Sequence, residues 1–328
     1  MSNSKIICLG VAVLLCGALS ISTMAQQAPP PINMKMLKPD VWAGLGGAGG
    51  NSTIIIGKTS VIVVDAKQTE AGAKDLLAEI AKITPKPVKT VFITHSDGDH
   101  FMGLVAYPPG IKIIAHENNK KEQETAIASG ARGAPPASIL PNQVVTKAKQ
   151  TMTIDGVKLE LHHFAPAHTS GDLIVYLPNQ KIVSTGDIVV TNRADDNPNV
   201  HFEKNGSTEG WITNVKGMIA LNADAYITGH GDIVTKADLQ RKLAATTARR
   251  NKIAAMVKEG KTVAEIKTAL PDAPAPGAAP RGAAPAAGAA PAGGGGGGAA
   301  ARGGAPAPAP ALTFVETAYQ EITKSAKK

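Results

Sequence analysis

The chain has 328 residues, a formal net charge of +8 and an aromatic content of only 3%. Its basic residues are scattered and are not interleaved with aromatic side chains, so the composition gives little support to nucleic-acid binding. Both cysteines, Cys8 and Cys16, lie near the start of the chain, inside a segment that we expect to be removed. The mature chain is therefore expected to lack a disulfide, a thiolate metal ligand and a cysteine nucleophile.

Residues 1–25 have the pattern of a secretory signal peptide. An apolar run over residues 6–21 follows a charged start and precedes small residues at the expected cleavage point. The run is shorter than the ~20 apolar residues of a membrane-spanning helix, and a retained anchor is the alternative. Lipidation of Cys16 is disfavoured because the bulky Leu15 precedes it. We therefore expect a periplasmic or secreted protein with no integral membrane span in its mature chain.

The sequence becomes periodic from residue 51 onward. Two β-rich runs at 52–57 and 60–66, separated by a turn that contains glycine, predict a hairpin. Apolar residues at helical spacing over 69–82 predict a helix that ends before two prolines. The other elements expected in this half are strands at 88–94 and 112–116 and a polar helix at 117–129.

Four strands are expected next, in two pairs around short turns. The first pair flanks the Asp155-Gly156 turn and the second pair flanks a turn at residues 179–180. Because strands and helices alternate in two similar β-rich halves, each closed by helices, the pattern favours a layered α/β fold. The elements expected in this half are strands at 151–154, 157–164, 173–178 and 181–187, a helix at 209–221, a strand at 225–228, a helix at 236–259 and a shorter helix that ends at 270.

Residues 271–311 consist almost entirely of alanine, glycine and proline. Such a stretch cannot bury enough apolar surface to offset its ordering entropy, so we expect a disordered insert. It separates one domain at 26–270 from a segment at 312–328 whose apolar residues form a single helical stripe. We expect this last helix to dock on the domain, because burial of the stripe outweighs the entropy of closing the loop.

Histidines and aspartates gather where the predicted strands end. The segment from His95 to His100, which reads HSDGDH, forms a tight loop directly after the strand at 88–94. Three later junctions carry His168, Asp187 and His230. In a layered α/β fold these junctions lie on one edge of the sheets, so their side chains can meet. A metal ion needs several nitrogen or oxygen donors within ~2.0–2.3 Å of one point, and this arrangement can supply them.

These segments resemble the metallo-β-lactamase superfamily of metal-dependent hydrolases over roughly residues 46–231. The family motif is His-x-His-x-Asp-His followed by a histidine, an aspartate and a final histidine, and the sequence presents HSDGDH and then His168, Asp187 and His230 in that order. The lead-in GGNSTIIIG…VIVVDA, which ends near Asp65, is also similar to the first hairpin of the family. The resemblance implies a four-layer αββα sandwich that binds two divalent metal ions, with zinc as the first expectation. It further implies a first metal held by His95, Asp97 and His168, a second held by Asp99, His100 and His230, and a bridging Asp187.

The sequence departs from the motif at Asp97, which replaces its second histidine. A carboxylate is a shorter ligand, so we expect it to fall ~1–2 Å short of the metal unless the loop moves. The replacement also lowers the positive charge of the site by one, which weakens the activation of a bound water. Oxygen-rich ligands shift the metal preference toward iron or manganese. Occupancy of the first metal position is therefore the point that the sequence leaves open.

The resemblance implies a hydrolase in which a metal-bound hydroxide attacks an ester, lactone, thioester or amide-like bond of a small-molecule substrate. Asp99 is the expected proton acceptor as well as a ligand. One alternative is a true β-lactamase, and Asp97 suggests two others: a degenerate metal-binding member or an iron redox protein. The polar loop at 191–208 is expected to shape the substrate pocket, and no oligomeric state is indicated.

Four further histidines fall outside the motif. His116 ends a predicted strand and is expected to be structural. His162 and His163 are adjacent on a strand, so they face opposite sides of it. His201 lies in the polar loop at 191–208, where the sequence offers it no recognisable partner.

Overall fold

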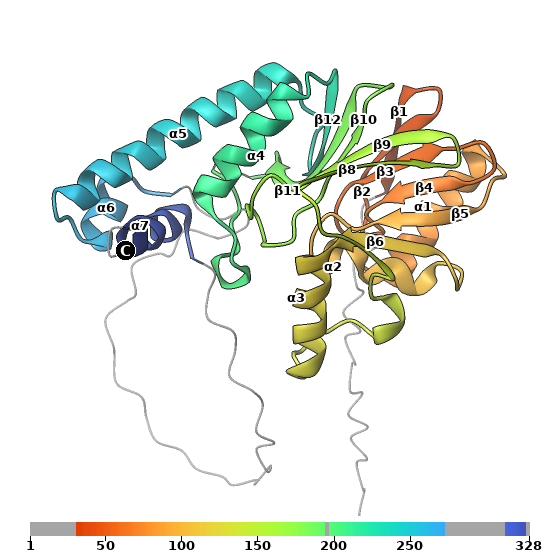
Figure 1. The fold of residues 1–328 in the computed structure, drawn as a ribbon, viewed down its shortest axis with the longest axis horizontal. Coiled ribbons are helices and arrows are strands. Elements are labelled where there is room, and N and C mark those ends of the chain that lie inside the picture. Colours follow the sequence, from red (N-terminus) through yellow and green to blue (C-terminus); the bar gives the residue numbers. More distant parts are fainter. Residues whose placement is uncertain (1–30, 194–196, 273–311, 326–328) are drawn as a thin grey trace, which may run out of the picture.

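The computed structural model describes residues 31–193, 197–272 and 312–325. The expected signal at 1–25 and all but the first two residues of the expected insert at 271–311 lie outside them. Among the described residues, no helix is both long enough and apolar enough to cross a membrane. The described chain folds into two β-sheets that carry helices on their outer sides (Figure 1).

The first sheet has seven strands, which follow one another across the sheet in sequence order. Neighbours from β1 to β4 are antiparallel, and neighbours from β4 to β7 are parallel. The hairpin expected at 52–66 is confirmed as β3 and β4. The strands are β1 (Ile32–Lys38), β2 (Val41–Gly46), β3 (Ser52–Ile56), β4 (Val61–Val64), β5 (Val88–Phe92), β6 (Lys112–His116) and β7 (Gln143–Val145).

The second sheet has five strands in the order β12-β11-β10-β9-β8. Its neighbours are antiparallel except for β11 and β12, which are parallel. All nine residues of β11 are buried, as expected for a strand that is covered on both faces. The strands are β8 (Lys149–Ile154), β9 (Val157–His162), β10 (Ile174–Leu177), β11 (Ile182–Val190) and β12 (Ala225–His230).

The helices begin where the sequence provides capping residues. Thr69 accepts a hydrogen bond from the backbone N–H of Gly72 at 3.0 Å, and Thr235 and Thr262 each form a reciprocal cap with an acidic residue three positions later. The predicted helices are confirmed to within a few residues, and a short helix, α2 (Gly98–Phe101), lies within the segment expected to be a tight loop. The others are α1 (Glu70–Ile83), α3 (Glu117–Ala128), α4 (Thr208–Ala220), α5 (Lys236–Lys258), α6 (Val263–Ala269) and α7 (Phe314–Ser325).

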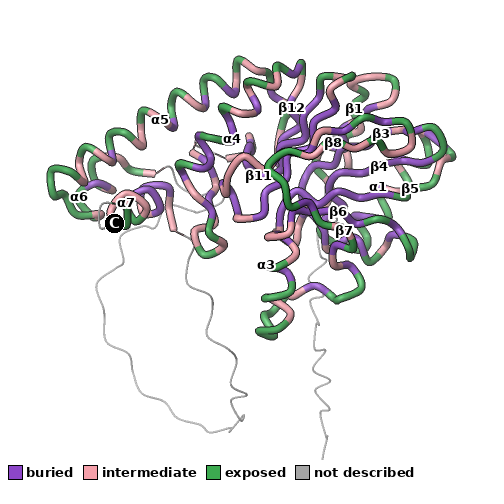
Figure 2. The backbone as a smooth tube through the Cα atoms, viewed as in Figure 1, coloured by how far each residue is buried: buried purple, intermediate pink, exposed green. Residues whose placement is uncertain are grey.

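Apolar side chains form one layer between the sheets and one on the outer side of each. Ile62 and Phe92 of the first sheet belong to the same buried cluster as Leu159 of the second sheet. Leu76 of α1 packs on the outer face of the first sheet, and Trp211 of α4 packs on that of the second. Figure 2 shows the buried strands between helices whose outward sides are exposed. The fold is thus the expected four-layer αββα sandwich.

The Asp155 carboxylate joins the two sheets at the turns of two hairpins, β8–β9 and β3–β4. Asp155 accepts hydrogen bonds from the backbone N–H groups of Thr59 and Ser60, at 2.8 and 2.7 Å, and from both of their hydroxyls. These bonds stabilise the charged form and lower the pKa of Asp155 to about 2. The β8–β9 turn is therefore tied to the β3–β4 turn.

Helix α7 packs against α5, α6 and the start of α4. Val315 and Ala318 share a buried cluster with Ile253 of α5 and Ile266 of α6. On its other side, the Glu321 carboxylate accepts a hydrogen bond from the backbone N–H of Thr208 at 2.7 Å and another from the Thr208 hydroxyl. The contact with Thr208 supports the first turn of α4, which directly follows the loop at 191–207.

The sequence analysis missed three strands, β1, β2 and β7. Strand β2 contains two glycines, which have low β-propensity, and β1 is half exposed at the edge of the sheet. The pairing of β1 with β2 and of β2 with β3, rather than their own pattern, makes them strands. Two predicted strands are also longer than expected, because β11 continues to Val190 and β12 to His230.

Candidate metal centre

The loop after β5 is shaped by a buried carboxylate. Asp65 accepts hydrogen bonds from the Thr94 backbone N–H at 2.9 Å and from its hydroxyl at 2.8 Å. Asp97 then stands at the N-terminus of α2, and its side chain makes no capping hydrogen bond. Its carboxylate is therefore free of the helix end and can contact other side chains of the loop, which also carries His95 and His100.

The other three junctions approach this loop from the second sheet. His168 lies in the connection between β9 and β10, and His230 ends β12. Asp187 lies inside β11 rather than after it. The pairing of β11 with β12 shifts at Gly186, whose φ is +54°, so the strand bulges one residue before Asp187. Gly229 on β12 leaves room for Asp187, since a Cβ there would lie 1.9 Å from Asp187 Oδ1.

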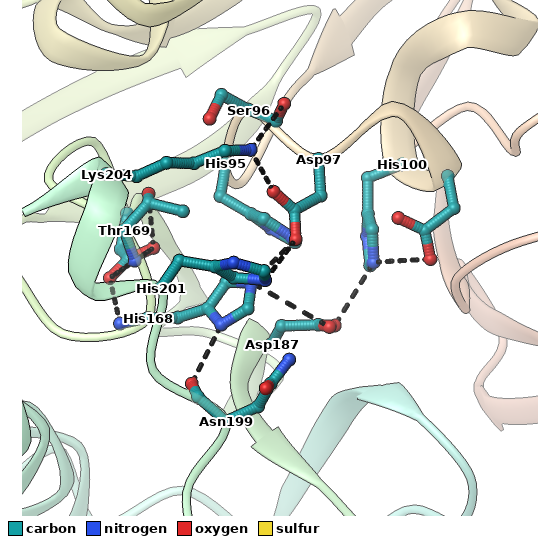
Figure 3. A network of polar contacts seen from close by, with 12 residues as sticks. His95, Ser96, Asp97, His100, His168, Thr169, Asp187, Asn199, His201 and Lys204 are labelled. Atoms are coloured by element: carbon teal, nitrogen blue, oxygen red, sulfur yellow. Dashed lines mark hydrogen bonds and ion pairs between the residues drawn. The ribbon is translucent and has the colours of Figure 1, made fainter. Parts of the chain in front are cut away.

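The structure brings the predicted site residues together in three overlapping groups. Within each group, one ligand atom per residue lies within 4.8 Å of the others. The first position consists of His95, Asp97 and His168, and the second position consists of Asp99, His100 and His230. The third group joins His95, His100 and Asp187, so Asp187 lies between the two positions (Figure 3).

The histidine rings are held by hydrogen bonds to their Nδ1 atoms. The partners are Thr94 Oγ1 for His95, at 2.9 Å, Asp65 Oδ2 for His100, at 2.8 Å, and the Asn199 carbonyl for His168, at 2.8 Å. Each bond turns Nε2 toward the shared space. Metal-binding histidines are commonly oriented by such a partner on the other ring nitrogen.

The residues present fit a divalent metal ion. His95 Nε2 belongs to a side chain that is only 1% exposed, yet it makes no hydrogen bond to any described residue. The two Nε2 atoms of His100 and His230 stand 3.2 Å apart, a separation that suits two ligands of one ion. A donor set of imidazole nitrogens and carboxylate oxygens is the chemistry that zinc, iron and manganese sites use.

The titratable groups of the two positions are strongly coupled. Burial opposes the charge on His168, but Asp97 and Asp187 outweigh it and raise the pKa of His168 to about 9. Burial likewise opposes the charge on His100, whose pKa is raised well above the usual value by Asp187 and Asp65. Burial and the neighbouring histidines lower the pKa of His95. The neighbouring carboxylates thus favour the protonated form of these two histidines, and a cation that bound there would have to displace the protons.

Asp97 lies close to the other two candidate ligands of the first position. Its Oδ2 lies 3.0 Å from His168 Nε2 and 3.7 Å from His95 Nε2. Its other oxygen, Oδ1, accepts a hydrogen bond from the ammonium of Lys204 (Figure 3). The positive charge of Lys204 compensates the negative charge that Asp97 introduces, so the pair is as neutral as an unprotonated histidine.

Glu203, Lys204 and Asn205 of the loop at 191–208 line a cavity beside the site. The cavity has a volume of about 1010 Å³, and its walls include Ser96, Gly98 and Lys204. The sequence analysis missed Lys204, and it missed that His201 contacts Asp97, with His201 Nε2 3.1 Å from Asp97 Oδ2. Lys204 and His201 both follow Asp187 on a non-periodic loop, so no sequence pattern predicts their position. Only their placement in a polar loop beside a motif residue could have drawn attention to them.

Comparison with known proteins agrees with the fold. The family profile described as the metallo-beta-lactamase superfamily matches residues 45–230, more than half of the chain. Among solved structures, the stereoselective inverting sec-alkylsulfatase Pisa1 from Pseudomonas sp. superposes with a TM-score of 0.61 at 19% identity, over 74% of this chain and 46% of that one. A metallo-beta-lactamase from Pontibacter korlensis gives 0.55 at 20% identity, over 66% of this chain and 99% of that one. The protein belongs to the metallo-β-lactamase superfamily.

Its relatives among characterised proteins have different activities. The 2,4-dinitroanisole O-demethylase subunit alpha of Nocardioides sp. (strain JS1661) is 27% identical, over 61% of this chain and 58% of that protein. A linear primary-alkylsulfatase of Pseudomonas sp. (strain ATCC 19151) is 21% identical, over 53% and 40%. A metallo-beta-lactamase type 2 of Bacillus sp. (strain 170) is 27% identical, over 62% and 78%. The chain therefore covers less than two thirds of the first two of these relatives.

Proposed function

We propose that the protein is an exported, metal-dependent hydrolase that cleaves an ester, lactone, thioester or amide-like bond of a small molecule. The observation that carries this proposal is the convergence of seven nitrogen and oxygen ligands beside a cavity of about 1010 Å³. The pattern of residues 1–25 supports export to the periplasm or beyond. The cavity carries both cationic and anionic side chains, and their charges limit which substrates can bind.

The seven side chains have separate roles in this proposal. His95, Asp97 and His168 would hold one ion, and Asp99, His100 and His230 the other. Asp187 serves both positions, because its Oδ1 lies 3.1 Å from His100 Nε2 and its Oδ2 lies 3.9 Å from His168 Nε2. Zinc is the proposed metal, with iron and manganese as the alternatives that the carboxylates allow. Bound divalent ions supply Lewis acidity that lowers the pKa of water and polarises a substrate oxygen.

Asp99 is the carboxylate best placed to handle the proton. Its side chain is 30% exposed, compared with 16% for Asp97 and 7% for Asp187. His230 Nε2 lies 3.0 Å from Asp99 Oδ2 and orients it. Although burial opposes ionisation, this contact and the charge on His100 lower the pKa of Asp99, so its carboxylate is ionised and able to accept a proton at neutral pH.

The Asp97–Lys204 pair favours a second candidate function, a member of the family that binds metal without turnover. A carboxylate already paired with an ammonium donates less charge to a cation than a free one. In that case the first position would be empty or weakly occupied. A true β-lactamase is a narrower form of the first proposal, supported by the relative from Bacillus sp. (strain 170), of which the chain covers 78%.

The test measures metal content and hydrolysis on the same preparation. The mature chain, purified without chelator, is analysed by mass spectrometry for metals and assayed on a panel of an ester, a lactone, a thioester, a sulfate ester and a chromogenic β-lactam. We expect close to two metals per chain and turnover that stops on chelation. Asp99→Asn should lower kcat by about 100-fold or more, in the range of general base catalysis, while Asp75→Asn, on the exposed side of α1, should not. One bound metal per chain without turnover on any substrate would favour the second candidate, and abundant iron would favour a redox protein.

A further inference from the structure

His201 enters the site from outside the family motif. Its Nε2 lies 3.1 Å from Asp97 Oδ2, the same oxygen that lies 3.0 Å from His168 Nε2 and 3.7 Å from His95 Nε2. Three imidazole nitrogens thus surround one carboxylate oxygen. In a tetrahedral site with bonds of ~2.0–2.1 Å, neighbouring ligand atoms stand about 3.3–3.4 Å apart. The three separations bracket that value, so each imidazole stands at a suitable distance from Asp97 Oδ2 to share an ion with it.

The ring of His201 is oriented in the same way as the other candidate ligands. Its Nδ1 lies 2.5 Å from Glu203 Oε1, which leaves Nε2 to face the first position. His100 has the same arrangement with Asp65. A carboxylate on the second ring nitrogen fixes the tautomer and raises the basicity of a histidine ligand. A histidine that only filled space in a surface loop would not need this partner.

The backbone around His201 is fixed to the segment that carries His168. The His201 N–H donates to the His168 carbonyl at 2.8 Å, and the Ser207 N–H donates to the Ala167 carbonyl at 2.8 Å. The His201 side chain is only 23% exposed, and its ring meets the His168 ring edge to face, with centroids 4.7 Å apart. Its position therefore depends on the same hydrogen bonds that place a motif ligand.

An independent feature of the first position also indicates a ligand. The buried His95 Nε2 points into this space without a hydrogen-bond partner in the described part of the chain. Asp97 meanwhile keeps one oxygen, Oδ1, against Lys204. The motif position lost an imidazole when aspartate replaced histidine, and the loop at 191–208 brings another imidazole to the same point.

We propose that His201 is a direct ligand of the first metal position, which then consists of three histidines and Asp97, with Lys204 holding the second oxygen of that carboxylate. This inference rests on the metal centre of the proposed function but not on any substrate or turnover. It assigns the loop at 191–208 a role in metal binding in addition to lining the cavity.

The test compares zinc binding by wild type, His201→Ala and His201→Asn in a chelator competition, with cobalt absorption spectra as a second readout. Loss of an outer hydrogen-bond partner of a ligand lowers metal affinity about 10- to 100-fold, so we expect both variants to lose about 100-fold or more at the first position only. Asparagine can still donate a hydrogen bond to Asp97, but it is a poor zinc ligand. The cobalt spectrum of His201→Ala should change and should recover when imidazole is added.

A matched control removes an imidazole that does not face the site. His116→Ala eliminates a histidine that stacks on His163, with ring centroids 3.9 Å apart, and it should bind zinc as wild type does. Unchanged zinc affinity in His201→Ala would overturn the inference, and so would wild-type affinity in His201→Asn, because His201 would then only position Asp97. A wild-type chain that binds no metal would overturn the proposed function itself, whereas a wild type with two metals and an unaffected His201→Ala would overturn this inference alone.

Discussion

Asp65 Oδ2 accepts a hydrogen bond from His100 Nδ1 at 2.8 Å, and the same carboxylate holds Thr94, whose hydroxyl contacts His95 Nδ1 at 2.9 Å. One buried side chain therefore orients a histidine of each metal position. Asp65 adopts a φ of 63°, a left-handed conformation that aspartate and asparagine tolerate better than most residues. This makes asparagine a suitable replacement, because it changes the charge and little else.

Asp65→Asn should weaken metal binding at both positions by about 10- to 100-fold each. The amide cannot accept from the Thr94 N–H, the Thr94 hydroxyl and His100 at once, so the free energy of unfolding should also fall by about 1.5–3 kcal/mol. Zinc competition and urea denaturation measure the two effects. Asp75→Asn is the control, and a loss confined to one metal position would contradict the shared role of Asp65.

Asp97→His restores the family motif, but we expect it to lower occupancy of the first position. The new imidazole would leave the ammonium of Lys204 without its carboxylate partner, close to the bound cation. Asp97→His combined with Lys204→Met should recover part of the lost affinity, with a coupling of about 0.5–3 kcal/mol between the two changes. Metal content by mass spectrometry and zinc competition are measured for wild type, the two single variants and the double variant. Additive effects would mean that Lys204 does not act through residue 97.

Gly50 lies against the ring of His100, where a side chain does not fit. A Cβ at Gly50 would stand 2.2 Å from His100 Cε1, so Gly50→Ala must displace that ring. We expect a loss of about 1–3 kcal/mol in stability together with loss of metal from the second position. Gly98→Ala is the matched control, because its Cβ would meet only the flexible Met102 side chain, at 3.1 Å. If the two variants behaved equally in thermal melts and metal analysis, Gly50 would not be needed to make room for the His100 ring.

Asp155 predicts an acid-dependent part of the stability that is independent of metal. Its pKa is lowered from 3.8 to about 2 in the folded chain, so the folded state binds a proton less readily than the unfolded state. The stabilisation is therefore complete above the unfolded value and disappears as the pH falls from about 4 toward 2. Urea denaturation from pH 7 to pH 3 should show Asp155→Asn less stable than wild type at pH 7, with the difference shrinking below pH 4. A difference that stays constant with pH would disprove the role of Asp155.

Most helices and strands could be predicted because their own residues carry the signal. Strand β5 is rich in β-branched and aromatic residues, and α1 has a capping threonine and a regular apolar face. Strands β1 and β2 could not be predicted in this way, since two glycines weaken β2 and the pairing partners of both are what define them. The bulge at Gly186, which sets the direction of Asp187, depends on the register between β11 and β12, and no local pattern specifies it.

The same distinction applies to the site. The seven motif residues could be predicted to converge, because strand ends meet at one edge of the fold and the resemblance supplied their order. Their binding of metal remains a proposal. His201 and Lys204 could not be predicted, because they reach Asp97 through hydrogen bonds between two loops that are about thirty residues apart in the chain. Contacts between loops have no periodicity and leave no signal in a single sequence.

Glu321 contacts Thr208 through space, but along the chain it comes after residues 273–311. During synthesis, every candidate ligand up to His230 is therefore present well before the carboxylate that supports the start of α4. Until α7 arrives, the loop that carries His201 and Lys204 is bonded to the His168 segment but lacks the contact of Glu321 with the start of α4. The order of synthesis thus separates the candidate ligands from the contact that supports the start of α4.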